Sequence, residues 1–312
     1  MAQTSSVDLI VPSYKPDEKL KHLLEMMGKQ TVKPDRIFLI NTEEEFLRKE
    51  YYSFCENLTL IHIKKEEFDH GGTRNYGVSL SDADFVLLMT QDAVPTDEFL
   101  IEKLLAPMES EQVAASYARQ LDDGKAGVVE NFTRQFNYPD QSYTKSAADI
   151  PRLGIKTYFC SNACAMYRRS VYMSLGGFVT KAIFNEDMIM ASRMVDAGFS
   201  IAYCADAKVV HSHKYTYRQQ FTRNFDLGVS QTMYREIFDR VKSESEGVKL
   251  VKTTMKYLLK SGKAWLIPDL ILASGFKFLG YKLGRNYEKL PRSLVVKFSM
   301  NKSFWKKERN IG

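Results

Sequence analysis

Short apolar runs recur along the N-terminal third of the chain. The run from Val7 to Val11 is apolar apart from Asp8, and similar runs follow at 37–40, 58–63 and 85–89. Runs of this length with polar residues at their ends are typical of strands that are buried on both faces. They predict four strands of one sheet.

Helical patterns lie between these runs. Apolar residues recur after the first run at i, i+3, i+4 and i+7, at Leu20, Leu23, Leu24 and Met27. This spacing gives a helix one apolar face, and Asp17 is placed to cap its N-terminus. Residues 73–80 predict a second, short helix. Strands that alternate with helices predict an α/β fold with a mostly parallel central sheet and helices on both faces.

Polar residues follow the predicted strands where each strand ends. In open α/β sheets, ligands bind outside the carboxyl ends of the strands. The residues expected at this edge, or in the loops after it, are Ser13, Tyr14, Asn41, Arg74 and Asp92. They are therefore the first candidates for a binding site.

The second half of the body has a less regular pattern. A strand is expected at 113–117, a polar stretch covers 122–150, and Val209-Val210 reads as a short strand. Glu186-Asp187 opens a predicted helix that reaches about Ala197, where Gly198 ends it. We expect this half to shape the part of a site where an acceptor substrate would bind.

The charge is unevenly distributed along the 312 residues. The net charge is +6, but residues 249–312 carry 15 Lys and Arg against three acids, so this tail has a charge of +12 and the rest of the chain −6. A basic tail attracts nucleic acid or the anionic face of a membrane. The body contains no recognisable nucleic-acid module, so no nucleic-acid partner is expected.

The tail favours a position on a membrane surface. Its longest uncharged stretch, 264–276 apart from Asp269, is too short to span a bilayer, which takes about 20 apolar residues. Aromatic residues are interleaved with its lysines, as in segments that lie among lipid headgroups. An ordinary basic helix packed on the body remains the alternative.

Further features favour the cytoplasm. Residues 1–6 are short and polar and lack the pattern of an export signal. The four cysteines show no paired metal spacing, which suits reduced thiols. The expected location is the inner face of the plasma membrane, with association into a homo-oligomer left open.

Three groups of residues could serve in acid–base chemistry or in binding a metal ion. Glu186-Asp187 lies at a helix N-terminus, which favours an ionised carboxylate, the form that a general base needs. Asp92 can hold a divalent cation, with His211 or His213 as a further ligand. Each also has a structural alternative, since strand-end aspartates cap turns, first-turn acids cap helices and isolated histidines are often structural.

The motifs resemble glycosyltransferase family 2, and within it bacterial rhamnosyltransferases of cell-wall and O-antigen synthesis. The matching segments occur in the family's order over about residues 7–228. They are VPSYK from Val11, HGGTRN from His70, MTQDAVP from Met89, Glu186-Asp187 with Arg193, and HSHKYT from His211. SYARQ from Ser116, FNYP from Phe136 and FCSNACAMYRR from Phe159 resemble the rhamnosyltransferase subgroup.

The resemblance implies an A-type glycosyltransferase fold and a role for each motif. The catalytic domain would cover residues 1–228, and a helical, basic, membrane-associating region would cover 229–312. Asp187 would be the catalytic base with Glu186 beside it, and Asp92, His211 and His213 would hold Mn²⁺ or Mg²⁺. The nucleotide-sugar site would comprise Pro12, Ser13, Tyr14, Asn41, Arg74, Gln91, Asp92, Asn162 and Arg223.

Two departures from the family pattern change these expectations. The Asp-x-Asp motif reads Thr90-Gln91-Asp92, so one carboxylate is missing and weaker metal binding is expected. The segment 220–224 lacks the tryptophan of the Gln-x-x-Arg-Trp motif of processive relatives, which argues against long processive synthesis.

The resemblance implies an inverting transferase that moves rhamnose from dTDP-L-rhamnose to a lipid-linked saccharide. Transfer from another nucleotide sugar, such as a UDP-hexose, is one alternative. The other is a catalytically silent, nucleotide-sugar-binding scaffold that kept the fold and lost the chemistry.

Overall fold

The computed structural model describes residues 5–241 and 244–307. Within them the chain forms two compact units. The first consists of residues 5–125, 137–180 and 186–212, and the second of 126–136, 181–185 and the described residues from 213 onwards. The domain boundary expected after residue 228 stays a prediction, since compact packing does not test where the catalytic function ends.

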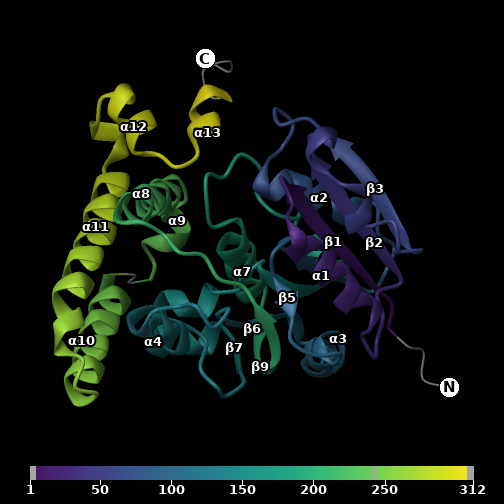
Figure 1. Cartoon of the computed structure of the whole chain (residues 1–312), viewed down its shortest axis with the longest axis horizontal. Helices are drawn as coiled ribbons and strands as arrows, with labels where there is room; N and C mark the ends of the chain where they lie inside the picture. The colour runs from purple at the N-terminus through teal and green to yellow at the C-terminus, as the bar shows by residue number, and fades with distance from the viewer. Residues whose placement is uncertain (1–4, 242–243, 308–312) are drawn as a thin grey trace. The chain divides into compact units, whose positions relative to one another are not determined.

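The first unit contains the sheet, whose strands are β1 Val7–Tyr14, β2 Arg36–Thr42, β3 Leu58–Ile63, β4 Phe85–Met89, β5 Val94–Pro95, β6 Val113–Leu121, β7 Tyr143–Lys145, β8 Cys164–Arg168 and β9 Ser200–Val210. Its helices are α1 Glu18–Gly28, α2 His70–Ser79, α3 Leu100–Leu105, α5 Ile150–Leu153, α6 Arg169–Ser174 and α7 Glu186–Asp196. The alternation of strands and helices follows the chain from purple to blue in Figure 1. The predicted α/β order is therefore confirmed.

The sheet is parallel in its N-terminal half and mixed beyond it. Strands β3, β2, β1 and β4 are parallel neighbours in that order. Strand β8 then runs antiparallel between β4 and β6, and β9 is parallel to β6 but antiparallel to β5 and β7. The pattern did not predict β8, because Cys164–Arg168 contains no β-branched residue.

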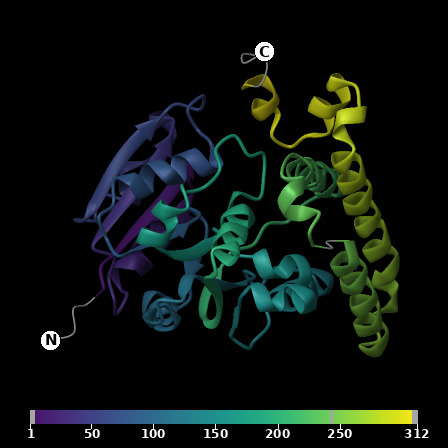
Figure 2. The same ribbon diagram turned by 180° about the vertical axis from the view of Figure 1, so that it is seen from behind.

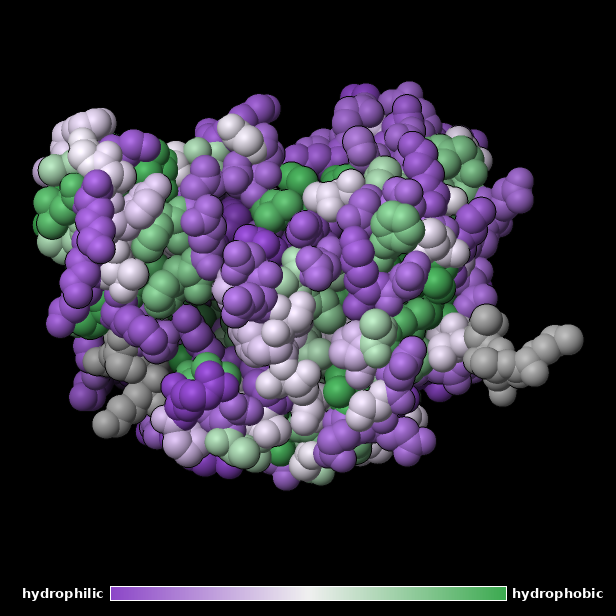
Figure 3. All heavy atoms as spheres, turned by 90° about the horizontal axis from the view of Figure 1, so that it is seen from below, coloured by the Kyte–Doolittle hydropathy of each residue, from purple (hydrophilic) through white to green (hydrophobic). Residues whose placement is uncertain are grey.

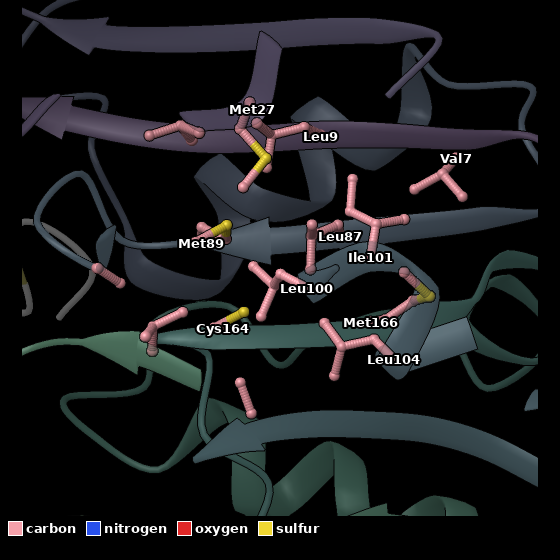
Figure 4. Packing of buried hydrophobic residues seen from close by; sticks show 14 of the residues in the cluster. Val7, Leu9, Met27, Leu87, Met89, Leu100, Ile101, Leu104, Cys164 and Met166 are labelled. Carbon is pink, nitrogen blue, oxygen red and sulfur yellow. The ribbon is translucent and has the colours of Figure 1, made fainter. Parts of the chain in front are cut away.

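Helices cover both faces of the sheet, as predicted. On one face, Leu9 of β1 and Leu87 of β4 belong to the same apolar core as Met27 of α1 and Leu100 of α3. Figure 4 shows these side chains with those of Cys164 and Met166 from β8. On the other face, α2 approaches β1 at Gly77, where an added Cβ would lie 2.5 Å from Cγ2 of Ile10.

Two helix starts near the site are capped as their sequences suggest. Asp17 accepts a hydrogen bond from the Lys19 N–H at 2.9 Å, which confirms its predicted role as the cap of α1. Asp69 accepts one from the Gly72 N–H at 2.7 Å, so α2 begins at His70 rather than at the expected residue 73. Helix α7 begins at Glu186 and stops before Gly198, as predicted.

The second unit is helical. Its helices are α4 Val128–Asn137, α8 Tyr217–Met233, α9 Arg235–Phe238, α10 Glu244–Lys260, α11 Ile267–Arg285, α12 Arg292–Phe298 and α13 Lys302–Lys307. Figure 2 shows α10 and α11 side by side. None of the helices in the described part of the chain is long and apolar enough to cross a membrane.

Glycines allow α8 and α11 to pack closely. A Cβ added at Gly280 would lie 2.3 Å from the Phe221 carbonyl oxygen, and one at Gly284 would lie 2.1 Å from that of Phe225. Any larger residue would collide with backbone. The crossing of the two helices therefore depends on these glycines.

Candidate active site

The carboxyl ends of β1 and β2 carry buried polar side chains. Within the described residues, Ser13 Oγ and Asn41 Oδ1 are buried without a hydrogen-bond partner. The Asn41 amide donates to the Glu43 carbonyl at 3.0 Å and lies 3.2 Å from His62 Nδ1. Buried polar groups usually have partners, so unpaired ones at this edge indicate atoms with the capacity to bind a ligand.

Gln91 connects the loop after β4 to the end of β1 by two hydrogen bonds. Its side-chain oxygen accepts from the Tyr14 N–H at 2.9 Å, and its amide nitrogen donates to the Tyr14 carbonyl at 3.0 Å. The Gln91 amide is thus occupied by the backbone of Tyr14, while the Tyr14 ring stays exposed. Pro12 is half-buried within β1.

Arg74 and Glu186 form a buried ion pair. Arg74 Nη1 lies 3.5 Å from Glu186 Oε1 and also donates to the His70 carbonyl at 2.8 Å. Burial is the largest effect and opposes ionisation of Glu186. The charges of Arg74 and His70, together with hydrogen bonds to the carboxylate, outweigh it and lower the pKa of Glu186 below its ordinary value. Glu186 is therefore ionised at neutral pH.

Asp187 has the opposite shift. Burial of its carboxyl group, followed by the charge of Glu186, raises the pKa of Asp187 to about 7. The N–H groups of Met188, at 2.8 Å, and Asn162, at 3.4 Å, point to this carboxylate and lower the pKa only in part. The N–H groups at the start of α7 thus favour the ionised form, in the expected direction, but burial and the charge of Glu186 have the larger effect.

Two residues of the sequence motifs hold the turn that precedes the acidic pair. The Asn75 amide donates to the Phe178 carbonyl and accepts from the Phe178 N–H, both at 2.9 Å. Arg193 donates to the Gly177 carbonyl at 3.1 Å. The motif HGGTRN and Arg193 thus fix the backbone near Glu186 and Asp187.

The candidate metal ligands of the first unit lie together. His211 Nε2 is 3.5 Å from Asp92 Oδ1, and His211 Nδ1 is 2.9 Å from Gln120 Oε1. One carboxylate oxygen and one imidazole nitrogen suit Mn²⁺ or another first-row divalent ion, so the donor set fits the expected metal. His213 is two residues farther along the chain and begins the last segment of the second unit.

The site thus consists of two groups of contacting residues. One half of the site contains Arg74, Asn162, Glu186 and Asp187, and the other half contains Asp92 and His211. Arg223 lies in α8 of the second unit, where its guanidinium is 4.5 Å from the centre of the Phe184 ring. Sequence reasoning did not assign a role to Gln120 or Asn75. Both lie within matched motifs, but nothing in a motif shows which side chain they contact.

Comparisons with known proteins identify the family of the chain. Residues 8–176 match the family described as Glycosyl transferase family 2. The chain is 40% identical to the O-antigen chain rhamnosyltransferase RfbN of Salmonella typhimurium over 96% of both chains. It is 42% identical to the O-antigen chain rhamnosyltransferase WbaN of Salmonella anatum, again over 96% of each.

Solved structures show the same fold. A mannosyltransferase of Pyrobaculum calidifontis, solved with GDP-mannose and Mn²⁺, matches with a TM-score of 0.58 at 14% identity, over 96% of this chain and 88% of that one. TarS of S. aureus, solved with UDP-GlcNAc, matches with a TM-score of 0.52 at 13% identity, over 91% of each chain. The fold is therefore the A-type glycosyltransferase fold, and the chain belongs to glycosyl transferase family 2.

Proposed function

We propose that this protein is an inverting rhamnosyltransferase that moves L-rhamnose from dTDP-L-rhamnose to a lipid-linked saccharide of an O-antigen chain. Similarity to RfbN and WbaN along almost the whole chain supports rhamnose and the acceptor class. The observation that carries the chemistry is the buried acidic pair at the start of α7, in which Glu186 lies 3.5 Å from Arg74, and burial together with the charge of Glu186 raises the pKa of Asp187.

Asp187 acts as the general base in this proposal. A base is most effective when its pKa lies close to the working pH, and the pKa of Asp187 is about 7. Its carboxylate takes the proton of an acceptor hydroxyl while that oxygen forms a bond to the anomeric carbon. The bond from that carbon to the diphosphate breaks on the opposite face, and its electron pair leaves with the diphosphate.

Asp92 and His211 would hold a divalent cation, Mn²⁺ or Mg²⁺, with His213 as a further ligand. Such an ion, when bound, offsets negative charge on the departing diphosphate. Only one acid is available because Thr90 replaces the first carboxylate of the motif. We therefore expect weak binding by the protein alone and tighter binding when the donor diphosphate is present.

The donor side of the site is proposed to follow the ends of β1, β2 and β4. Ser13 and Asn41 offer buried hydrogen-bonding atoms, and Tyr14 offers an exposed aromatic ring for the nucleoside. Gln91 keeps Tyr14 in register with the loop that carries Asp92. Arg223 and Asn162 remain proposed contacts of the nucleotide sugar.

The decisive experiment is a donor screen with a lipid-linked saccharide acceptor. The protein is incubated with dTDP- and UDP-sugars and divalent metal, the released nucleotide is measured, and the product linkage is analysed. Release of dTDP with an inverted rhamnosyl linkage is expected. Preference for a UDP-hexose would replace the donor assignment, and no release with any sugar would favour a silent binding scaffold.

Asp187→Asn tests the base. This change keeps the shape of the side chain but removes its basicity, so turnover is expected to fall about 10²- to 10⁴-fold while nucleotide binding persists. Asp206→Asn, at an exposed position of β9, is the matched control and should leave turnover unchanged. Full activity of Asp187→Asn would remove Asp187 from the mechanism.

Peripheral association with an anionic membrane is proposed for the second unit. The exposed side of α11 carries Ile271, Leu272, Phe278 and Leu279, and Trp265 just before α11 is 71% exposed. Figure 3 shows apolar residues beside hydrophilic ones at its left edge, where α10 and α11 lie. Apolar side chains among lysines suit the headgroup region on the cytoplasmic side, where a lipid-linked acceptor would be reached.

A further inference from the structure

Gln120 makes two hydrogen bonds with its buried side-chain amide. The side chain lies near the end of β6 and is 7% exposed. Its nitrogen donates to Ser161 Oγ at 2.9 Å, and its oxygen lies 2.9 Å from His211 Nδ1. The amide nitrogen and the amide oxygen of Gln120 therefore each make a hydrogen bond, so the side chain does more than fill space in the core.

The direction of these bonds fixes the state of the imidazole. Because the Gln120 nitrogen faces Ser161, the atom that faces His211 is an oxygen, which can only accept. His211 must then carry a proton on Nδ1. In the neutral ring, Nε2, the atom on the Asp92 side at 3.5 Å, therefore bears the lone pair. A histidine that binds a metal through Nε2 needs this tautomer, and a partner on its other nitrogen commonly sets it.

We propose that Gln120 is a positioning residue that fixes the orientation and the Nδ1–H tautomer of His211 for binding of a divalent cation with Asp92. The proposal rests on the proposed function, since it takes Asp92 and His211 as metal ligands. It adds a residue that touches neither the cation nor the substrate and acts through His211.

Gln120 also connects the two halves of the site. Ser161, whose hydroxyl accepts the hydrogen bond from the Gln120 amide, directly precedes Asn162. The Asn162 N–H points to Asp187 at 3.4 Å. The Asn162 side chain is held in turn, since its oxygen accepts from the Tyr167 hydroxyl at 2.8 Å. A change at Gln120 is therefore expected to affect the ring of His211 most, and the backbone around Asn162 to a smaller extent.

The first test reads the tautomer in the metal-free protein. Nitrogen NMR of the histidine rings is recorded over a pH series that extends to the alkaline side, so that the neutral form of the His211 ring is observed directly. The His211 signals are assigned by their loss in His211→Asn. The wild type and Gln120→Glu should show Nδ1–H, because a carboxylate accepts from Nδ1 as the amide oxygen does.

Gln120→Met keeps the length of the side chain but removes the acceptor, so its His211 should shift toward the Nε2–H form. Gln141→Met, at an exposed position, is the matched control and should match the wild type. An Nε2–H tautomer in the wild type, or an unchanged tautomer in Gln120→Met, would overturn the inference. If Gln120 had only a structural role, the Gln120→Met change would leave the ring-nitrogen signals of His211 unchanged.

The second test measures binding of Mn²⁺ by electron paramagnetic resonance in the presence of dTDP. Gln120→Met should weaken binding about 10- to 100-fold, and Gln120→Glu should restore it to near the wild-type value. Asp92→Asn separates the two hypotheses. Normal binding in Asp92→Asn refutes the proposed metal site itself, whereas weak binding in Asp92→Asn with normal binding in Gln120→Met refutes only the role of Gln120.

Discussion

Glu186 and Asp187 are neighbours in the chain, yet their pKa values shift in opposite directions. Arg74 faces Glu186 and stabilises its charge, whereas Asp187 lies next to that charge and accepts from the N–H groups of Met188 and Asn162. One ionised acid therefore makes the other harder to ionise. In the proposed mechanism, Glu186 supplies a fixed negative charge and Asp187 exchanges a proton near neutral pH.

This division predicts the pH dependence of the reaction. The pKa of Asp187 is raised to about 7, so the base is lost by protonation as the pH falls below that value. We expect kcat/KM to fall about tenfold per pH unit on the acid side. Glu186→Gln removes the neighbouring charge, so the acid limb should move to lower pH. An acid limb that stays in place in Glu186→Gln would contradict the coupling.

Lys145 predicts a second pH effect, on stability. Its buried ammonium donates to the Lys156 carbonyl at 2.8 Å and to the Phe159 carbonyl, and burial lowers its pKa to about 7. In the unfolded chain the pKa of Lys145 has its ordinary value near 10.5. At a pH between about 7 and 10.5 the unfolded chain therefore binds this proton more tightly than the folded one. The free energy of unfolding should therefore rise with pH from about 7, by at most about 1.4 kcal/mol per unit.

Urea unfolding at about pH 7 and about pH 9 measures this contribution. Lys145→Met removes the titrating group, so its free energy of unfolding should rise less than that of the wild type over the same range. The difference between the two slopes isolates Lys145 from every group that both proteins share. Equal slopes would show that Lys145 keeps its ordinary pKa in the fold.

At the scale of elements, the contact of α8 with α11 depends on the absence of side chains. A Cβ at Gly284 would lie 2.1 Å from the Phe225 carbonyl oxygen, which belongs to backbone and cannot rotate away. Gly284→Ala should therefore lower the free energy of unfolding by about 1 to 3 kcal/mol. Gly275 lies in the same helix with nothing within 4 Å of an added Cβ.

Gly275→Ala is thus the matched control, and it should raise stability by about 0.5 to 1 kcal/mol because alanine favours a helix more than glycine does. Urea unfolding of the two variants compares them directly. If both changes had the same sign, close packing would not be the reason for Gly284.

The elements that the sequence predicted well are those whose signals are local. The strands β1 to β4, the cap at Asp17 and the start of α7 each follow from a run, a spacing or a capping residue. Strand β8 and most of β9 were missed, because Cys164–Arg168 contains no β-branched residue and residues 202–208 include only small, polar or aromatic side chains with no clear apolar run. The site shows a similar limit, because residue types suggested Asp187 and His211 as candidates. The ion pair of Glu186 with Arg74 and the hydrogen bond of His211 with Gln120 are visible only in the fold.

For the whole molecule, the separation of charge along the chain agrees with the proposed roles of a catalytic body and a membrane-associating tail. The acidic body contains the proposed catalytic residues, and residues 249–312 carry a net charge of +12. Charge alone attracts a chain to an anionic surface only weakly in salt, because ions screen it within about 10 Å. Stable association therefore needs apolar contact as well, and α11 has a suitable face.

Vesicle sedimentation tests this combination. The protein should bind vesicles that contain anionic phospholipid and bind neutral vesicles weakly, with affinity that falls as salt is raised. Replacing Ile271 and Phe278, which are 53% and 57% exposed, by serine should weaken binding about tenfold or more, since each buried apolar side chain contributes about 1.5 to 3 kcal/mol.

Phe54→Ser removes an aromatic side chain of comparable exposure, 45%, from the first unit and should leave vesicle binding unchanged. Thermal unfolding of both proteins checks that the double variant keeps its fold. Two outcomes would contradict the surface assignment: equal binding by the double variant and the wild type, or equal loss in Phe54→Ser. Salt-sensitive binding that survives in the double variant would instead show that the lysines act without the apolar face of α11.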